Sequence, residues 1–251
     1  MRADRREFLG LAAATLVASA AAAAPRRGSA RIRAIAFDAF PIFDPRPIAA
    51  LASELFPDKG AELMSAWRTR QFEYTWLRSL AGRYEDFRRT TEDALVYAAA
   101  ATKVAVDDLA RKRLLDAYAS LRAWPDVRPV LEALRAAGVR MAFLSNFTAA
   151  MLDAAVASAG LGGFFEPHLT TDRVRTFKPD PRAYQMGVDV FRLRREEIAF
   201  VASAPWDAAG AKWFGYPTVW IDRTGAPPEE LGVTPDATAP NLSVLLELVK
   251  H

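Results

Sequence analysis

The stretch Ile32–Asp38 (IRAIAFD) decides the fold of this chain. Its apolar run predicts a buried strand, and the acidic residue that follows then lies at the strand's carboxyl end. In open α/β sheets, ligands bind and chemistry occurs at that edge. The chain has no cysteine and shows no serine–histidine pair, so Asp38 is the strongest candidate for a covalent nucleophile. An aspartate in this place can equally cap a helix or turn, and the rest of the chain must decide.

Strand-like and helical segments alternate through most of the chain. Three further short apolar runs predict strands, at Val139–Leu144, Ile198–Val201 and Thr218–Ile221. Stretches with helical spacing lie between them, at Arg128–Ala137, Ala149–Ala159, Pro181–Phe191 and Asp207–Phe214. Near-continuous apolar strands that alternate with helices indicate a parallel sheet covered on both faces. The predicted class is therefore α/β, with a Rossmann-like parallel-sheet core.

One segment, residues 47–121, carries no strand signal and interrupts this alternation. It predicts three or four amphipathic helices, at Ile48–Phe56, Ala61–Leu80, Tyr84–Ala101 and Val106–Leu121. We therefore expect a core formed by residues 31–46 and 122–251, with residues 47–121 inserted as a helical cap. The functional site is expected in the cleft between the two parts.

The first thirty residues predict an export signal rather than part of the fold. Arg5 and Arg6 precede an apolar, alanine-rich run, and small residues suited to cleavage follow near residues 22–28. The adjacent arginines followed by Phe-Leu-Gly resemble a twin-arginine signal, which predicts a periplasmic protein. The run is too rich in alanine to be a convincing membrane span. An uncleaved anchor is the alternative.

The composition excludes several classes of partner. About 220 residues remain after the signal, enough for one domain with an insertion. The formal net charge is only +3, and no basic block or aromatic–basic tract is present, which disfavours nucleic acid. The two isolated histidines, His168 and His251, form no zinc pattern. We expect no metal, no cofactor and no membrane contact of the mature domain.

Polar residues at the ends of predicted strands form a second set of candidates. Ser145 and Asn146 end the second strand, where they suit binding of an oxygen or a halide, or capping of the next helix. Lys178 lies in a loop, and Asp207 follows the third strand. A lysine beside Asp38 would lower the pKa of that carboxyl group by about 1–3 units and keep it anionic.

A cap-helix arginine is a further candidate. Met64, Arg68, Phe72 and Trp76 recur at every fourth position, on one face of the expected helix. The arginine therefore lies on a largely apolar face, which a cap would turn toward the cleft. It either extends its guanidinium group to solvent or binds an anion there.

These motifs resemble the haloacid dehalogenase superfamily. The matching pattern is a strand followed by Asp38, then Ser145–Asn146, then Lys178–Asp180 (KPD), and a late acidic residue, Asp207. Three stretches are further similar to the type II (S)-2-haloacid dehalogenases: Trp67–Leu80 (WRTRQFEYTWLRSL), Gly82–Phe87 (GRYEDF) and Pro205–Ala211 (PWDAAGA). This resemblance extends from Ile32 to the C-terminus.

The resemblance implies an activity and assigns roles to residues. Asp38 would displace halide from C2 of a short 2-haloalkanoic acid with inversion, and water would then hydrolyse the aspartyl ester. Arg68 and Asn146 would hold the halide and Ser145 the substrate carboxylate. The remaining roles are support of the nucleophile by Lys178 and Tyr184, orientation of the lysine and water by Asp207, and an apolar wall of Phe40, Phe72, Phe87 and Trp206. Members often form homodimers, so a dimer is expected by analogy.

One difference from the superfamily's phosphatases and two departures from the dehalogenase pattern bear on this expectation. The superfamily's phosphatases carry a second aspartate two residues after the nucleophile, where this chain has Phe40, which disfavours metal-dependent phosphoryl transfer. Pro41 lies in a loop one residue shorter than usual, which lacks the customary Gly-Thr. Ala202 and Ala204 replace the Ser and Asn that support the hydrolytic water.

These departures lead to a hypothesis and two alternatives. Halide displacement keeps its residues, whereas ester hydrolysis loses polar support, so we expect a slow or differently organised second step. One alternative is a degenerate relative that binds a small carboxylate without turnover. The other is a hydrolase of the same fold that acts on another leaving group, such as phosphate.

Overall fold

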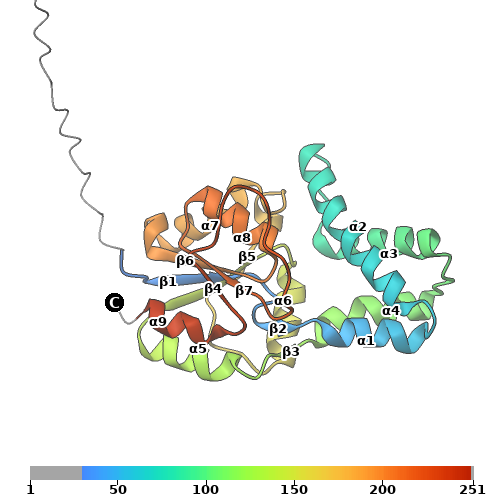
Figure 1. Cartoon of the computed structure of the whole chain (residues 1–251), viewed down its shortest axis with the longest axis horizontal. Coiled ribbons are helices and arrows are strands. Elements are labelled where there is room, and N and C mark those ends of the chain that lie inside the picture. Colours follow the sequence, from blue (N-terminus) through green and yellow to red (C-terminus); the bar gives the residue numbers. More distant parts are fainter. Residues whose placement is uncertain (1–29, 250–251) are drawn as a thin grey trace, which may run out of the picture.

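A six-stranded parallel sheet forms the centre of the molecule. The computed structural model describes residues 30–249, and the expected signal segment lies outside them except for residue 30. The sheet has the order β5-β4-β1-β6-β7-β8, and every neighbouring pair in it is parallel (Figure 1). Its strands are β1 (Ala34–Phe37), β4 (Arg140–Ser145), β5 (Leu169–Thr170), β6 (Ile198–Ala202), β7 (Thr218–Ile221) and β8 (Ala237–Ala239).

The expected parallel α/β core is confirmed, and its four predicted strands correspond to β1, β4, β6 and β7. The sequence analysis did not predict the two edge strands of this sheet, β5 and β8. The edge strand β5 has two residues and β8 has three, too few to produce a recognisable hydrophobic pattern. Each of them forms backbone hydrogen bonds with a longer strand, β5 with β4 and β8 with β7, so their pairing depends on the assembled sheet.

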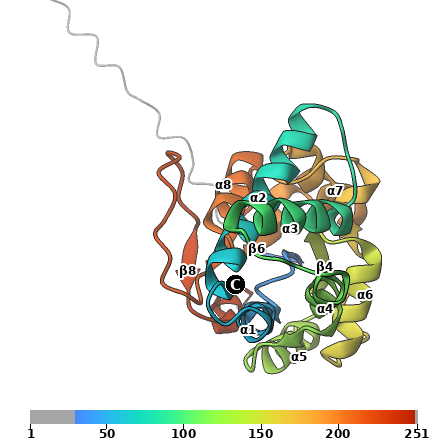
Figure 2. The same cartoon turned by 90° about the vertical axis from the view of Figure 1, so that its right-hand side faces the viewer.

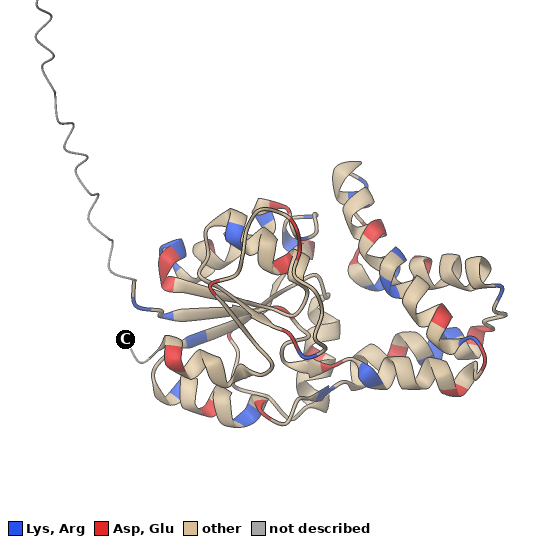
Figure 3. Cartoon of the chain, viewed as in Figure 1, with Lys and Arg blue, Asp and Glu red and all other residues tan. Residues whose placement is uncertain are grey.

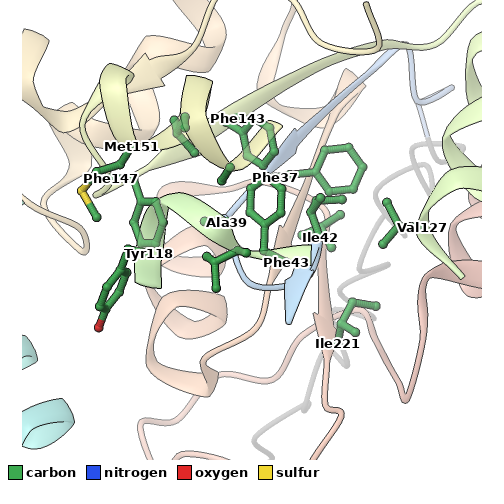
Figure 4. Packing of buried hydrophobic residues seen from close by; sticks show 14 of the residues in the cluster. Phe37, Ala39, Ile42, Phe43, Tyr118, Val127, Phe143, Phe147, Met151 and Ile221 are labelled. Atoms are coloured by element: carbon green, nitrogen blue, oxygen red, sulfur yellow. The ribbon is translucent and has the colours of Figure 1, made fainter. Parts of the chain in front are cut away.

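Helices cover both faces of the sheet, and β1 shows how the sequence separates the two faces. Ile35 and Phe37 belong to one buried cluster, whereas Ala34 and Ala36 belong to the other. Figure 4 shows Phe37 packed among the aromatic and aliphatic side chains of the first cluster. The core helices are α5 (Val127–Ala136), α6 (Ala149–Ser158), α7 (Pro181–Phe191), α8 (Pro205–Phe214) and α9 (Leu245–Leu248). Short 3-10 helices are η2 (Thr171–Arg173), η3 (Arg195–Glu197) and η4 (Leu242–Val244).

A helical insertion projects to one side of this core (Figures 1 and 2). The chain enters it through the short strand β2 (Phe43–Asp44) and returns through β3 (Arg122–Ala123), which pairs antiparallel with β2. Its elements are α1 (Arg46–Leu55), α2 (Gly60–Leu80), α3 (Phe87–Thr102), α4 (Asp108–Asp116) and η1 (Ala117–Ser120). The last expected helix, residues 106–121, is thus divided into α4 and a 3-10 turn.

Buried polar contacts hold the insertion together. The indole N–H of Trp67 on α2 donates to the carbonyl of Thr91 on α3 at 2.8 Å, and Gln71 Nε2 donates to Thr91 Oγ1 at 2.7 Å. All three side chains are almost fully buried, so these bonds satisfy groups that water cannot reach. Asp86 caps the start of α3 by accepting from the amide of Arg89.

Charged residues of both signs are interspersed over the core and the insertion (Figure 3). Among residues 30–249, no helix is both long and apolar enough to cross a bilayer.

Candidate active site

The polar residues at the strand ends meet at one edge of the sheet. Asp38 follows β1, whose two neighbours in the sheet are β4 and β6. Because parallel strands end at the same edge, Ser145 at the end of β4 and Ser203 just past β6 flank it. The amide of Asp38 donates to the carbonyl of Val201 at 2.9 Å, which fixes its backbone to β6.

Lys178 joins the two candidate carboxylates. Its Nζ lies 2.9 Å from Asp38 Oδ1 and 2.5 Å from Asp207 Oδ2. The lysine and Asp207 side chains are 1% exposed, whereas the side chain of Asp38 is 14% exposed. A buried ammonium is tolerated only when it is paired and hydrogen-bonded, and here two carboxylates pair it. Only Asp38 of the three has an open side from which a ligand could approach.

Tyr184 supports this network from behind. Its hydroxyl group donates to Asp207 Oδ1 at 2.7 Å, and its side chain is fully buried on α7. The close approach of α7 and α8 requires Gly210, because a Cβ atom there would lie 2.5 Å from the Tyr184 hydroxyl oxygen. The structure therefore connects Tyr184 to the nucleophile through Asp207 and Lys178.

The three charged groups differ in their ionisation. Burial raises the pKa of Asp207 to about 6, although the nearby Lys178 opposes this rise. Burial would also raise the pKa of Asp38, but the charge and hydrogen bond of Lys178 outweigh it and hold that pKa below its usual value. Burial disfavours the charged lysine, yet the two carboxylates raise the pKa of Lys178 above its usual value. The Asp38 carboxylate is therefore anionic at neutral pH.

Ser203 is a member of the site that the sequence analysis did not single out. Its Oγ donates to Asp38 Oδ2 at 3.2 Å, and the amide of Phe40 lies 3.4 Å from the same oxygen. The signal was present, because Ser203 directly follows an apolar strand, as Asp38 and Ser145 do. Alanines flank it on both sides, so no neighbouring polar residue marks the position as part of a site.

Ser145 and Asn146 occupy the second strand end in different ways. Ser145 Oγ accepts from the amide of Phe147 at 3.2 Å, so it stabilises its own turn. Asn146 Oδ1 accepts from the backbone amide of Lys178 at 3.1 Å and so ties the lysine loop to β4. Neither residue caps the next helix, because Thr148 caps α6. The capping interpretation of this pair is therefore wrong.

Arg68 lies on α2 between aromatic rings. Its Cζ is 5.0 Å from the ring centre of Phe40 in the core and 4.6 Å from that of Phe72 in the insertion. Its Nη1 donates to Gln71 Oε1 at 2.9 Å. The guanidinium group is thus held over apolar faces by cation–π contacts, close to the loop that follows Asp38.

The expected apolar residues form two aromatic groups. Phe72 contacts Trp206 edge-on at 5.2 Å, and Trp76, which the sequence analysis placed on the same helical face, packs against both. Phe40 and Phe87 each contact Phe147, at 5.4 Å between ring centres. Phe87 therefore supports the loop of the nucleophile indirectly, through Phe147.

Two contacts fasten the insertion to the core beside the site. The backbone amide of Phe177 donates to Ser79 Oγ on α2 at 2.9 Å. The hydroxyl group of Tyr84, in the loop between α2 and α3, donates to Asp172 of η2. These two contacts therefore attach the helical insertion to the core near the carboxyl edge of the sheet.

The two alanines lie where the sequence comparison noted a loss of polar groups. Ala202 is fully buried at the end of β6. Ala204 is the N-cap of α8, and it gives that helix no side-chain cap. No group of three or more histidine, aspartate or glutamate residues suited to a metal occurs within the part of the chain that the structure describes.

Comparisons with known proteins agree with this geometry. The sequence signature of the haloacid dehalogenase-like hydrolases matches residues 15–215. The haloacetate dehalogenase H-2 of Moraxella sp. (strain B) is 40% identical over 220 residues, which are 87% of this chain and 98% of that protein. The (S)-2-haloacid dehalogenase of Pseudomonas sp. (strain YL) is 41% identical over 218 residues, 86% of this chain and 94% of that one.

Solved structures are also similar. A crystal structure of an L-2-haloacid dehalogenase superposes with a TM-score of 0.86 at 43% identity and covers 88% of this chain and 100% of its own. The Xanthobacter autotrophicus L-2-haloacid dehalogenase with chloropropionic acid covalently bound gives a TM-score of 0.80 at 32% identity, with 87% and 98% covered.

Proposed function

Because the chain belongs to the haloacid dehalogenase-like hydrolases, we propose that it hydrolyses short 2-haloalkanoic acids to 2-hydroxy acids. The reaction passes through an ester on Asp38 and acts on (S) substrates. The observation that carries the proposal is the ion pair between the buried Lys178 and Asp38, which keeps Asp38 anionic at the carboxyl edge of the sheet. A carboxylate in this state is a nucleophile toward carbon.

In the first step, one oxygen of Asp38 attacks C2 of the substrate. The carbon–halogen bond breaks on the opposite side of that carbon, so the configuration inverts and halide leaves with the bonding electron pair. Phe40 stands where a phosphatase has its second carboxylate, so no acid is offered to an oxygen leaving group there. The aromatic groups exclude water, which strengthens the carboxylate as a nucleophile.

Charge balance assigns a role to Arg68. Asp38, Asp207 and Lys178 together carry one net negative charge, which repels an anionic substrate. The guanidinium group of Arg68 compensates for it beside Phe40. We propose that Arg68 and Asn146 hold the departing halide and that Ser145 contacts the substrate carboxylate.

In the second step, water attacks the ester carbonyl carbon of Asp38. The bond from that carbon to the ester oxygen breaks; this oxygen, which came from Asp38, stays on C2 and takes a proton, and the 2-hydroxy acid leaves while the oxygen of water remains in the Asp38 carboxylate. Overall, one water is consumed, and one halide and one proton are released. Ala202 and Ala204 offer the water no polar side chain, so we propose that ester hydrolysis is the slower step.

Halide release from (S)- and (R)-2-chloropropionate, each with and without EDTA, tests the proposal. We expect release from the (S) enantiomer only, unchanged by EDTA. With enzyme in excess in H₂¹⁸O, the label should enter Asp38, and rapid quenching with peptide mass spectrometry should detect the ester on Asp38 before it decays. Release without label in Asp38 would exclude the ester mechanism.

Other outcomes would identify the alternatives. Absence of halide release combined with a raised Tm in the presence of 2-chloropropionate would indicate a degenerate carboxylate-binding relative. Activity toward phosphate esters that requires Mg²⁺ would indicate a hydrolase of the same fold that acts on phosphate instead of halide. An Asp38 ester that forms but persists would place the defect in the second step.

We further propose that the chain is exported through the twin-arginine route and acts in the periplasm as a homodimer. The support is the Arg5–Arg6 pair ahead of the apolar run, and analogy with the family for the dimer. Replacement of both arginines by lysine should abolish periplasmic activity, and light scattering should give twice the mass of one chain. Unchanged export would contradict the twin-arginine route, and the mass of a single chain would contradict the homodimer.

A further inference from the structure

The loop that follows Asp38 is held by residues from two distant parts of the chain. We propose that Trp124 and Arg223 are positioning residues for the nucleophile: together they clamp the backbone carbonyls of residues 40–43 and so fix the loop on which the Asp38 carboxylate depends. The inference rests on the proposed function and extends it to residues that lie behind the loop.

Trp124 binds three of the four carbonyls. Its backbone amide donates to the carbonyl of Ile42 at 3.1 Å. Its indole Nε1 lies 3.2 Å from the carbonyl of Phe40 and 3.1 Å from that of Phe43, so one N–H is shared between the two ends of the loop. A rigid indole with two acceptors fixes the loop at both ends.

Arg223 binds the fourth carbonyl. Its Nη2 donates to the carbonyl of Pro41 at 3.0 Å. The same guanidinium group forms a two-pronged ion pair with Asp126 at 2.9 and 3.0 Å, and its Cζ lies 4.5 Å from the ring centre of Trp124. The side chain is 11% exposed, and a charged pair this well shielded is stronger and more rigid than a surface pair.

The loop needs these external donors. Pro41 has no N–H, and the only backbone bonds within the loop run from the amides of Ile42 and Phe43 to the carbonyl of Ala39. The side chains of Ala39, Ile42 and Phe43 point into the buried cluster (Figure 4). The carbonyls of residues 40–43 therefore have no partner inside the loop, and buried carbonyls without partners are costly.

A displacement of the loop would change the position of the Asp38 carboxylate directly. The amide of Phe40 lies 3.4 Å from Asp38 Oδ2, and the ring of Phe40 lies 5.0 Å from the guanidinium carbon of Arg68. The clamp thus sets both the carboxylate and one wall of the proposed halide site. Small displacements of reacting groups have large effects, since about 1 Å can cost 10²-fold in rate.

The clamp also lies where the chain passes between core and insertion. Phe43 of β2 pairs with Ala123 of β3, the residue just before Trp124. Arg46 at the start of α1 places its Cζ 4.5 Å from the same indole ring and forms an ion pair with Asp44. The indole of Trp124 therefore contacts the nucleophile loop and the segment that leads into the insertion, and it lies on the segment that leads back from the insertion.

The test compares Trp124→Phe, Arg223→Met and Arg223→Ala with the wild type. Trp124→Phe keeps an aromatic ring but loses the indole donor. Arg195→Met is the matched control, because Arg195 also stacks on a ring, that of Phe214 at 4.0 Å, and donates to a carbonyl, yet it lies at the opposite, amino end of β6. Halide release by the wild type is measured first, so failure of the proposed function is seen separately.

We expect ester formation on Asp38, followed by single-turnover rapid quench, to be about 10- to 100-fold slower in the Trp124 and Arg223 variants and unchanged in the Arg195 control. Added guanidinium ion should restore at least half of the lost rate in Arg223→Ala without raising its Tm, which a purely structural role would not produce. The proposal is overturned if ester formation stays within twofold of the wild type, or if the loss follows Tm and guanidinium does not rescue it. If Arg223→Ala does not fold, the rates of ester formation in Trp124→Phe and Arg223→Met decide by the same twofold criterion.

Discussion

Lys178 Nζ lies 2.9 Å from Asp38 Oδ1, although 140 residues separate the two along the chain. The contact joins a strand end to a loop that lies beyond β5. Since the ammonium is buried and also bound to a second carboxylate, it is held in place without any contribution from substrate. The nucleophile is therefore charged and oriented before a ligand arrives.

Removal of this ammonium should damage both activity and stability. In Lys178→Met, two buried carboxylates face each other without a cation, so the pKa of Asp38 rises and halide release falls by at least about 10²–10³-fold. Loss of one partner of a buried ion pair costs about 3–5 kcal/mol. Urea unfolding and halide release measure the two effects.

The control for that variant is Lys212→Met, which breaks a more exposed pair with Asp236. This change should cost less than about 1 kcal/mol and leave kcat unaltered. Halide release by Lys178→Met within tenfold of the wild type would contradict the assigned role of the ammonium.

The pH profile should report Asp207 rather than Asp38. Asp207 has a pKa of about 6, raised by burial, so it is anionic above pH 6 and protonated below it. Protonation removes one of the two carboxylates that hold Lys178. We expect kcat/KM, which reports the free enzyme, to fall on the acid side with an apparent pKa near 6, well above the lowered pKa of Asp38. An acid limb that begins only near pH 4 would assign the loss to Asp38.

Ser203 should contribute to the first chemical step. Its hydroxyl group donates to Asp38 Oδ2 at 3.2 Å and so fixes the orientation of the attacking carboxylate, and a displacement of about 1 Å can cost 10²-fold in rate. Ser203→Ala should therefore slow ester formation about 10- to 100-fold in single-turnover rapid quench. Ser120→Ala, which removes an exposed hydroxyl from η1, is the control. Equal rates of ester formation in both variants would contradict a role of Ser203 in the first step.

Ala204→Asn should improve two properties at once. Ala204 is the N-cap of α8 and offers no side-chain acceptor, so an asparagine there stabilises the fold by about 0.5–2 kcal/mol. The added amide also lies where the family pattern supports the hydrolytic water, and we expect ester hydrolysis about tenfold faster. Ala204→Ser separates the effects, because it supplies a cap without an amide. No change in the decay of the Asp38 ester in Ala204→Asn would exclude this explanation of a slow second step.

The residues of the site were largely predictable, and their contacts were not. Strand ends pointed to Asp38 and Ser145, and the resemblance supplied Tyr184. The sequence could not show that Tyr184 contacts Asp207, because this depends on the separation of α7 and α8, which Gly210 permits. Ser203 escaped attention because strand-end position alone does not distinguish a ligand from a turn residue.

By itself, the sequence determined the parallel α/β core, the helical insertion and the acidic residue after the first strand. It could do so because hydrophobic periodicity and strand order are local properties, written into segments such as Ile32–Asp38. Only the tertiary structure decided which charges pair and what holds the nucleophile loop. Those contacts join residues far apart in the chain, such as Pro41 and Arg223, whose proximity exists only once the sheet has assembled.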